Sequence, residues 1–175
     1  TVSIDSISSL ATKAEIPETV NIKGAEYAVT SISAKALAGN TKITSVSIPE
    51  TVNSLPTGLF KGCSSLAAVK LPSKITEIPA DTFNGTAITN AVLPATVTKI
   101  GNRAFEGTQL TSVSLPSSLS SLGKDAFKDC KKLTGVTLPA NFKSIPAGAF
   151  SGCSALKGIA PAAGIKALDL AGTAA

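Results

Sequence analysis

The chain has 175 residues, of which 43% are hydrophobic, 4% aromatic and 15% charged, and it contains no histidine. This apolar content is too high for intrinsic disorder and suits one compact domain or one repeat array, while no stretch reaches the roughly 18 to 20 uninterrupted apolar residues that a membrane-spanning helix needs. The net charge of +5 comes from lysines spread along the chain with few aromatic residues, and the densest basic stretch, residues 124–132, is interrupted by Asp125 and Asp129, so nucleic acid is not the expected partner.

The N-terminal part, residues 1–36, is predicted to be a cap that contains a hairpin. It starts at Thr1 with neither the basic start nor the apolar run of a signal peptide, so we expect a mature or excised fragment that is part of a longer chain or assembly. The strands "VNI" and "YAV" flank Lys23 and Gly24, a pair suited to a tight turn. The hairpin is expected to cover the first edge of the array, with Tyr27 as a packing residue of the hairpin rather than a binding residue.

Residues 37–160 are a predicted repeat array, because several ladders share one period. Leu-Pro or Ile-Pro pairs recur at intervals of 23, 22, 22 and 23 residues, and an apolar residue, usually Phe, follows the same period. The prolines are Pro49, Pro72, Pro94, Pro116 and Pro139, and the second ladder is Leu37, Phe60, Phe83, Phe105, Phe127 and Phe150. A single unit could not bury its apolar residues alone, so neighbouring units must stack.

Each unit contains one short strand with one face turned inward. In "LAAVKLP", Val69 and Leu71 alternate with Ala68 and Lys70, which is the period of a strand, and Pro72 ends the strand because it donates no backbone hydrogen bond. Stacked units predict a right-handed solenoid with about six short parallel strands forming a concave sheet, short strands and turns on the convex side, and little α-helix. The phenylalanines are expected to form one buried row, and Gly62 to permit a tight corner after Phe60.

The three cysteines are assigned to structure rather than to chemistry. Cys63, Cys130 and Cys153 occupy a corner position that holds Asn or Thr in other units, so this position favours a small, partly buried group that can form a weak hydrogen bond to a backbone turn. No C-x-x-C pair is present, and a zinc site is not expected without histidine. Three buried free thiols are the preferred interpretation, and a Cys130–Cys153 disulfide is the alternative, with poor geometry because equivalent side chains on stacked turns point the same way.

The segment "LTSVSLPSSLSSLGKDAFKDCKKLTGVTLP", residues 110–139, resembles the BspA-like leucine-rich repeats, whose unit reads LxxVxLPxxLxxIgxxAFxgC. The resemblance covers about residues 31–160 and implies a leucine-rich repeat solenoid. It also implies a bacterial adhesion-type module, secreted or at the cell surface, that binds a protein or glycan partner on a cell surface or matrix. Beyond Leu156 the pattern decays, with Pro161 where a strand leucine belongs, so residues 161–175 are either a degenerate last repeat or a C-terminal cap.

The outward positions of the predicted concave strands are the candidate binding face. They are small, polar and nearly uncharged, and they lack the Tyr, Trp or Arg anchors of tight interfaces, so we expect weak binding through polar contacts and water. The candidate residues are Ser45, Ser47, Lys70, Asn90, Ser112, Ser114 and Thr137. The alternative is a structural scaffold or stalk in an extracellular assembly, without a ligand of its own.

Catalysis is not predicted. No histidine can act as a general base, and acids such as Asp81, Glu106 and Asp169 are scattered over different units without a paired arrangement. Gly-bearing pieces such as "GNRAFEG" recur because the repeat turns there, so they are not phosphate loops. The sequence therefore predicts no catalytic residues, no cofactor and no metal.

Overall fold

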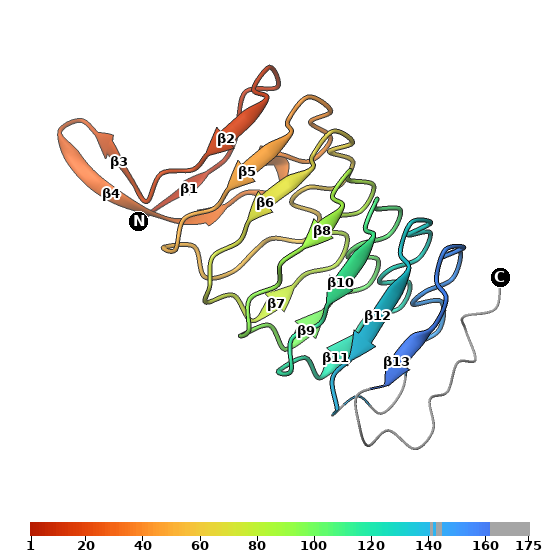
Figure 1. Ribbon diagram of the computed structural model, residues 1–175. Coiled ribbons are helices and arrows are strands. Elements are labelled where there is room, and N and C mark those ends of the chain that lie inside the picture. The colour runs from red at the N-terminus through yellow and green to blue at the C-terminus, as the bar shows by residue number, and fades with distance from the viewer. Residues whose placement is uncertain (141, 143–144, 162–175) are drawn as a thin grey trace.

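The main feature of the fold is a row of short parallel strands, one from each turn of a solenoid (Figure 1). The computed structural model describes residues 1–140, 142 and 145–161. Each turn contains one concave strand, and we number the turns 1 to 7 in chain order. The concave strands are β2 (Lys13–Glu15), β5 (Ser45–Ser47), β6 (Ala68–Lys70), β8 (Asn90–Ala91), β10 (Ser112–Ser114), β12 (Gly135–Leu138) and β13 (Ile159–Pro161). About six strands were predicted, and the additional one is β2, which lies in the segment assigned to the cap. We call the solvent-facing side of this row the concave face.

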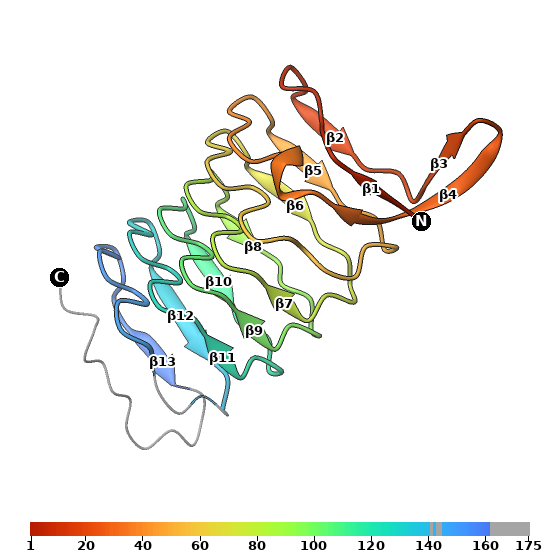
Figure 2. The ribbon, with the colours of Figure 1, turned by 180° about the vertical axis from the view of Figure 1, so that it is seen from behind.

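A second parallel sheet lies on another side of the turns (Figure 2). It contains β7 (Glu77–Ile78), β9 (Lys99–Ile100) and β11 (Ser121–Leu122), paired in that order. Ile78, Ile100 and Leu122 point inward from these strands and are at most 8% exposed. The prediction of short strands and turns opposite the concave sheet is confirmed.

The predicted N-terminal hairpin is present. Strands β3 (Thr19–Ile22) and β4 (Ala25–Ile32) pair antiparallel, and Lys23 and Gly24 turn the chain with φ values of 51° and 86°. The hairpin forms a separate sheet with β1 (Val2–Ile4), in the order β1-β4-β3, and projects beyond the row of turns (Figures 1 and 2). It therefore does not pair with β2, the end strand of the concave row. Tyr27 lies opposite Val20 in the hairpin and is 39% exposed.

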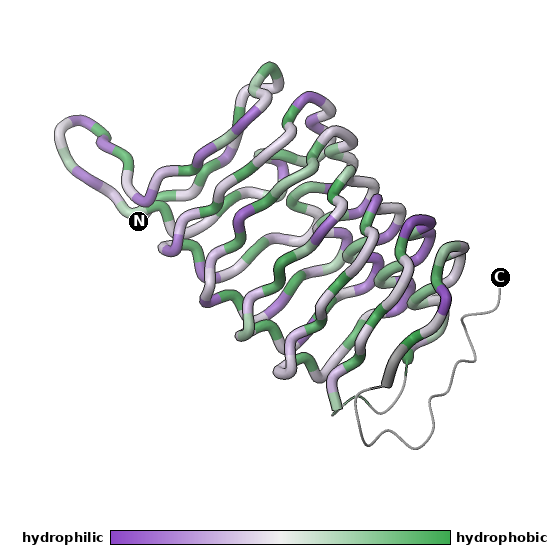
Figure 3. Tube along the Cα trace, viewed as in Figure 1, coloured by the Kyte–Doolittle hydropathy of each residue, from purple (hydrophilic) through white to green (hydrophobic). Residues whose placement is uncertain are grey.

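The interior is filled by equivalent apolar residues of successive turns, which repeat along the tube in Figure 3. The predicted phenylalanine row is confirmed. Neighbouring rings stack with centroids 5.1 to 5.4 Å apart, and each ring is at most 3% exposed. The row consists of Phe60, Phe83, Phe105, Phe127 and Phe150. This spacing is close to the strand separation of a sheet, about 4.8 Å, so the rings and the strands stack along one axis.

Tight corners lie on both sides of each phenylalanine. Gly62, two residues after Phe60, has a φ of 73°, as its predicted role requires. In turn 5 the equivalent residue is Asp129, which takes the same left-handed conformation with a φ of 57°. The corner conformation is therefore kept where glycine is replaced.

Regular helix is nearly absent from the described part of the chain. Only a 3-10 helix, η1 (Ala34–Ala36), occurs there, and the described residues include no helix long and apolar enough to cross a membrane. At the C-terminal end, Pro161 pairs with Leu138, so it does take the place of a strand leucine. The remainder of the predicted last repeat or cap, residues 162–175, lies outside the described residues.

Candidate functional site

Parallel pairing aligns the predicted binding residues into columns along the concave face. In the first part of the row, Ser45 pairs with Ala68 and Ser47 with Lys70. In the second part, Ser112 pairs with both Asn90 and Gly135, and Ser114 with Thr137. All seven predicted residues are therefore on one face, in two groups: Ser45, Ser47 and Lys70 in one sheet, and Asn90, Ser112, Ser114 and Thr137 in the other.

The two groups are separated by a split in the strand row. The concave strands form one sheet in the order β2-β5-β6 and another in the order β13-β12-β10-β8, and the described hydrogen bonds do not join β6 to β8. The amides of Thr111 and Thr134 donate to the preceding turn, whereas the described backbone bonds include none from the equivalent amide of Thr89. The other two sides of the same junction stay joined, through β7 and β9 and through the amide of Phe83, which donates to Ala104.

Apolar side chains that are buried elsewhere become exposed at this split. In turns 2, 5 and 6 the two inward-facing strand residues are at most 8% exposed, for example Val46 and Leu138. In turns 3 and 4 the equivalent residues are all partly exposed: Val69, Leu71, Ala91 and Leu93. Beside them Val92, at an outward position, is 80% exposed.

The sequence of turn 4 gives a reason for the split. Turn 5 reads "SVSLP", with Val113 inward, whereas turn 4 reads "NAVLP", with the smaller Ala91 inward and Val92 outward. The alternation is thus out of phase with the pairing register by one residue, and register in a sheet is normally fixed by that alternation. Ala91 also fills less of the interior than valine, and a narrow gap of about 10 Å³ beside it reaches inward to Phe83. Val92 is not among the predicted binding residues, and this phase error is the signal that could have identified it.

Two hollows lie along the concave face on either side of Lys70. The first, about 520 Å³, covers the split and is lined mainly by apolar groups, including Val69, Leu71, Val92 and Pro94. The second, about 380 Å³, lies over turns 1 and 2 and is lined by three carboxylates, Glu15, Glu18 and Glu50, together with Lys70.

Strand β2 adds concave residues that the sequence interpretation missed. Lys13 pairs with Ser45, and Glu15 pairs with Ser47, so both extend the columns of the concave face. They were missed because residues 1–36 were assigned to a cap, although the Ile16-Pro17 pair ends this strand as Ile48-Pro49 ends the next.

The carboxylate of Glu50 is held at the edge of the second hollow. It accepts hydrogen bonds from the backbone N–H and the hydroxyl of Ser73, both at 2.8 Å. These bonds, together with the positive charges of Lys70 and Lys74, lower the pKa of Glu50. Glu50 therefore stays ionised at neutral pH.

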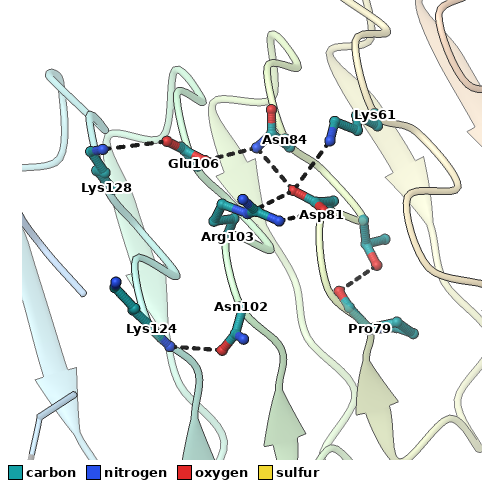
Figure 4. A network of polar contacts seen from close by, with 10 residues as sticks. Lys61, Pro79, Asp81, Asn84, Asn102, Arg103, Glu106, Lys124 and Lys128 are labelled. Atoms are coloured by element: carbon teal, nitrogen blue, oxygen red, sulfur yellow. Dashed lines mark hydrogen bonds and ion pairs between the residues drawn. The ribbon is translucent and has the colours of Figure 1, made fainter. Parts of the chain in front are cut away.

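The turn side, which contains the phenylalanine corners, has most of the described ion pairs (Figure 4). Asp81 is 7% exposed and lies 3.6 Å from Lys61 Nζ and 3.2 Å from Arg103 Nε. Asn84 donates to Asp81 and Glu106, and Glu106 lies 3.8 Å from Lys128. These cations are paired with acids of neighbouring turns, so this network links turns rather than presenting free positive charge.

The cysteines lie in the interior as free thiols. Each thiol donates to a backbone carbonyl of the preceding turn: Cys63 to Leu37, Cys130 to Phe105 and Cys153 to Phe127, at 3.0 to 3.1 Å. The preferred interpretation is confirmed, and the alternative Cys130–Cys153 disulfide is absent. Burial raises the pKa of Cys63, and the contact with Cys153 together with burial raises that of Cys130. The described residues contain no group of three potential ligands that could hold a metal ion.

The repeat that builds this face is that of a known family. Six copies of the BspA type leucine rich repeat are recognised over residues 76–169, more than half of the chain. The chain belongs to the BspA type leucine-rich repeat family. The predicted resemblance is thereby confirmed, and no curated protein matches the chain.

Solved structures of leucine-rich repeat proteins share this fold. A leucine-rich repeat protein from Bacteroides ovatus is 33% identical, with a TM-score of 0.82 over 84% of this chain and 39% of its own. The T. pallidum leucine rich repeat protein TpLRR is 28% identical, with a TM-score of 0.78 over 91% of this chain and 74% of its own. The pneumococcal vaccine antigen PcpA, 18% identical with a TM-score of 0.53 over 93% of this chain and 43% of its own, shows the fold alone. The BspA type chain described here thus spans 39% of the length of the Bacteroides protein.

Proposed function

We propose that this chain is a non-catalytic binding module at a bacterial cell surface or outside the cell, and that its concave face contacts a protein or glycan partner. Membership of a bacterial leucine-rich repeat family supports the class of function. A pure scaffold or stalk has no need for exposed apolar groups between its concave strands, whereas a binding module does. Exposed apolar groups therefore distinguish the two interpretations.

The observation that carries the proposal is the apolar exposure at the split. Elsewhere the concave face is polar, and the inward residues of turns 2, 5 and 6 are buried. At turns 3 and 4, Val92 is exposed, and the inward residues Val69, Leu71, Ala91 and Leu93 beside it are partly exposed. Contiguous exposed apolar groups rimmed by polar residues are typical of interaction sites. The polar columns would then form the rim, and the expected polar contacts would surround an apolar centre.

The test begins with a screen of the purified chain against matrix proteins and glycans. The affinity of the partner found is then measured for the wild-type chain and for two double variants of it. Ser114→Glu with Thr137→Glu adds charge to the concave face, and Thr76→Glu with Ser120→Glu adds the same charge beside β7 and β11 on the other sheet. All four side chains are exposed, so the fold should tolerate each change.

The double variant Ser114→Glu with Thr137→Glu is expected to weaken binding at least tenfold, because its two carboxylates would be crowded or buried at a contact that the native hydroxyls permit. The pair on the second sheet should leave binding unchanged. If the variant Thr76→Glu with Ser120→Glu lost binding while Ser114→Glu with Thr137→Glu bound fully, the concave assignment would be wrong. A chain that binds none of the probes but assembles with itself at rising concentration would favour the scaffold.

A further inference from the structure

The two hollows of the concave face differ in chemistry, and this difference selects a kind of partner. The hollow over turns 1 and 2 has three carboxylates against the single ammonium group of Lys70. The described ion pairs include neither Glu15 nor Glu18, and both side chains are exposed. Although the whole chain is basic, with a net charge of +5, this part of the concave face has an excess of negative charge that favours a cationic group.

The hollow over the split has the opposite character. Its lining is mostly apolar, from Val69, Leu71, Val92, Pro94 and Ala95, and the narrow gap below it continues toward Phe83. An aliphatic or aromatic side chain placed here would cover the partly exposed inward residues of turns 3 and 4. It would thus bury the apolar surface that the phase error of "NAVLP" leaves open.

The spacing of the hollows fits an extended peptide. The acidic hollow is centred between turns 1 and 2, and the apolar hollow between turns 3 and 4, so they lie two turns apart. At about 4.8 Å per turn this is roughly 10 Å. An extended peptide in the polyproline II conformation rises about 3.1 Å per residue and completes a turn in three residues, so two side chains three residues apart point to the same side and would reach the two hollows together.

We propose that the concave face binds an extended peptide segment of a partner protein that runs along the row of strands, with a Lys or Arg side chain between Glu15 and Glu18 and an apolar side chain, three residues away, over the split at Val92. This proposal rests on the proposed function, because it specifies the partner of the same face. Lys70, which lines both hollows, lies between the two side chains, and its ammonium would donate a hydrogen bond to a backbone carbonyl of the peptide.

The experiment uses synthetic capped peptides with one Arg and one Leu in a Gly-Ser background, at separations from one to six residues and in both orders. Their affinities for the full chain are measured by fluorescence anisotropy. Binding should be strongest at a separation of three, and peptides that contain only Arg or only Leu should bind at least tenfold more weakly.

Variants then assign each side chain to its hollow. Val92→Ser should weaken the best peptide about tenfold, because it removes most of the exposed apolar group that the Leu covers. The double change Glu15→Gln with Glu18→Gln should remove the preference for Arg over its uncharged analogue citrulline, and this preference should fall with added salt in the wild type. Leu10→Ser and Glu26→Gln are matched controls, since both positions are exposed and line neither hollow.

The proposal fails if affinity does not depend on the separation, or if Val92→Ser binds like the wild type. If no peptide binds, yet a partner from the screen is lost in the Ser114→Glu with Thr137→Glu variant, the proposed function stands and the peptide assignment is wrong. Sedimentation analysis covers a further outcome. A dimer that Val92→Ser dissociates would show that the apolar hollow takes a second copy of this chain, which would also overturn the peptide assignment.

Discussion

Replacing Phe105 with alanine is expected to remove a large part of the stability of the array. Phe105 is 0% exposed, and its ring stacks on Phe83 and Phe127 with both centroid distances at 5.1 Å. Truncating a buried phenylalanine costs about 3 to 5 kcal/mol, and each stacked aromatic pair adds about 0.5 to 1.5 kcal/mol beyond burial. The range for truncation already includes lost ring contacts, so the loss of two stacked pairs, in turns that cannot close the gap while their strands stay in register, places Phe105→Ala in its upper part, about 4 to 5 kcal/mol.

Urea denaturation followed by far-ultraviolet circular dichroism measures this loss, since the chain has no tryptophan to report it by fluorescence. Phe60 supplies the matched comparison. It is equally buried but has one described stacking partner, Phe83, so Phe60→Ala should cost about 1 kcal/mol less. A loss below about 1 kcal/mol for Phe105→Ala, with an unchanged denaturant slope, would refute the stacked row as a source of stability.

Two further predictions concern titratable groups. Cys63, Cys130 and Cys153 should react slowly with an alkylating reagent in the folded chain and completely after denaturation. The pKa values of Cys63 and Cys130 are raised, and all three thiols are buried and donate to backbone carbonyls, so a reagent reaches them poorly. Mass spectrometry that shows rapid native labelling of all three would contradict this. The lowered pKa of Glu50 means that its hydrogen bonds to Ser73 contribute stability above the unfolded pKa, and that this contribution is lost as the pH falls through the folded pKa. Ser73→Ala should move the pKa of Glu50 upward in an NMR titration, and an unchanged pKa would exclude the hydroxyl as a cause.

The sequence predicted the regular part of the fold because that part repeats. The phenylalanine period, the Leu-Pro pairs and the corner at Gly62 each follow from a local rule that is met many times, so agreement among several ladders is decisive. The corner cysteines were assigned correctly for the same reason, since Asn and Thr at equivalent positions show what that position accepts.

The irregular parts were harder to predict because each occurs once. Strand β2 lies before the hairpin, outside the period, and its concave residues Lys13 and Glu15 were therefore left in the cap. The split between β6 and β8 depends on how Ala91 and Val92 compete for one register, which is a matter of packing between turns rather than of local preference. The hollows arise from that packing, and the binding role of the seven predicted concave residues stays a proposal.

The split between β6 and β8 also bears on how the array unfolds. In a linear repeat protein, cooperativity comes from nearest-neighbour coupling between turns, and every hydrogen-bonded interface adds to that coupling. The junction of turns 3 and 4 has this coupling on two of its three sides only. It is therefore one junction at which turns 1 to 3 and turns 4 to 7 can open as separate units in hydrogen exchange, and a ligand that bridges it would couple the two blocks more strongly.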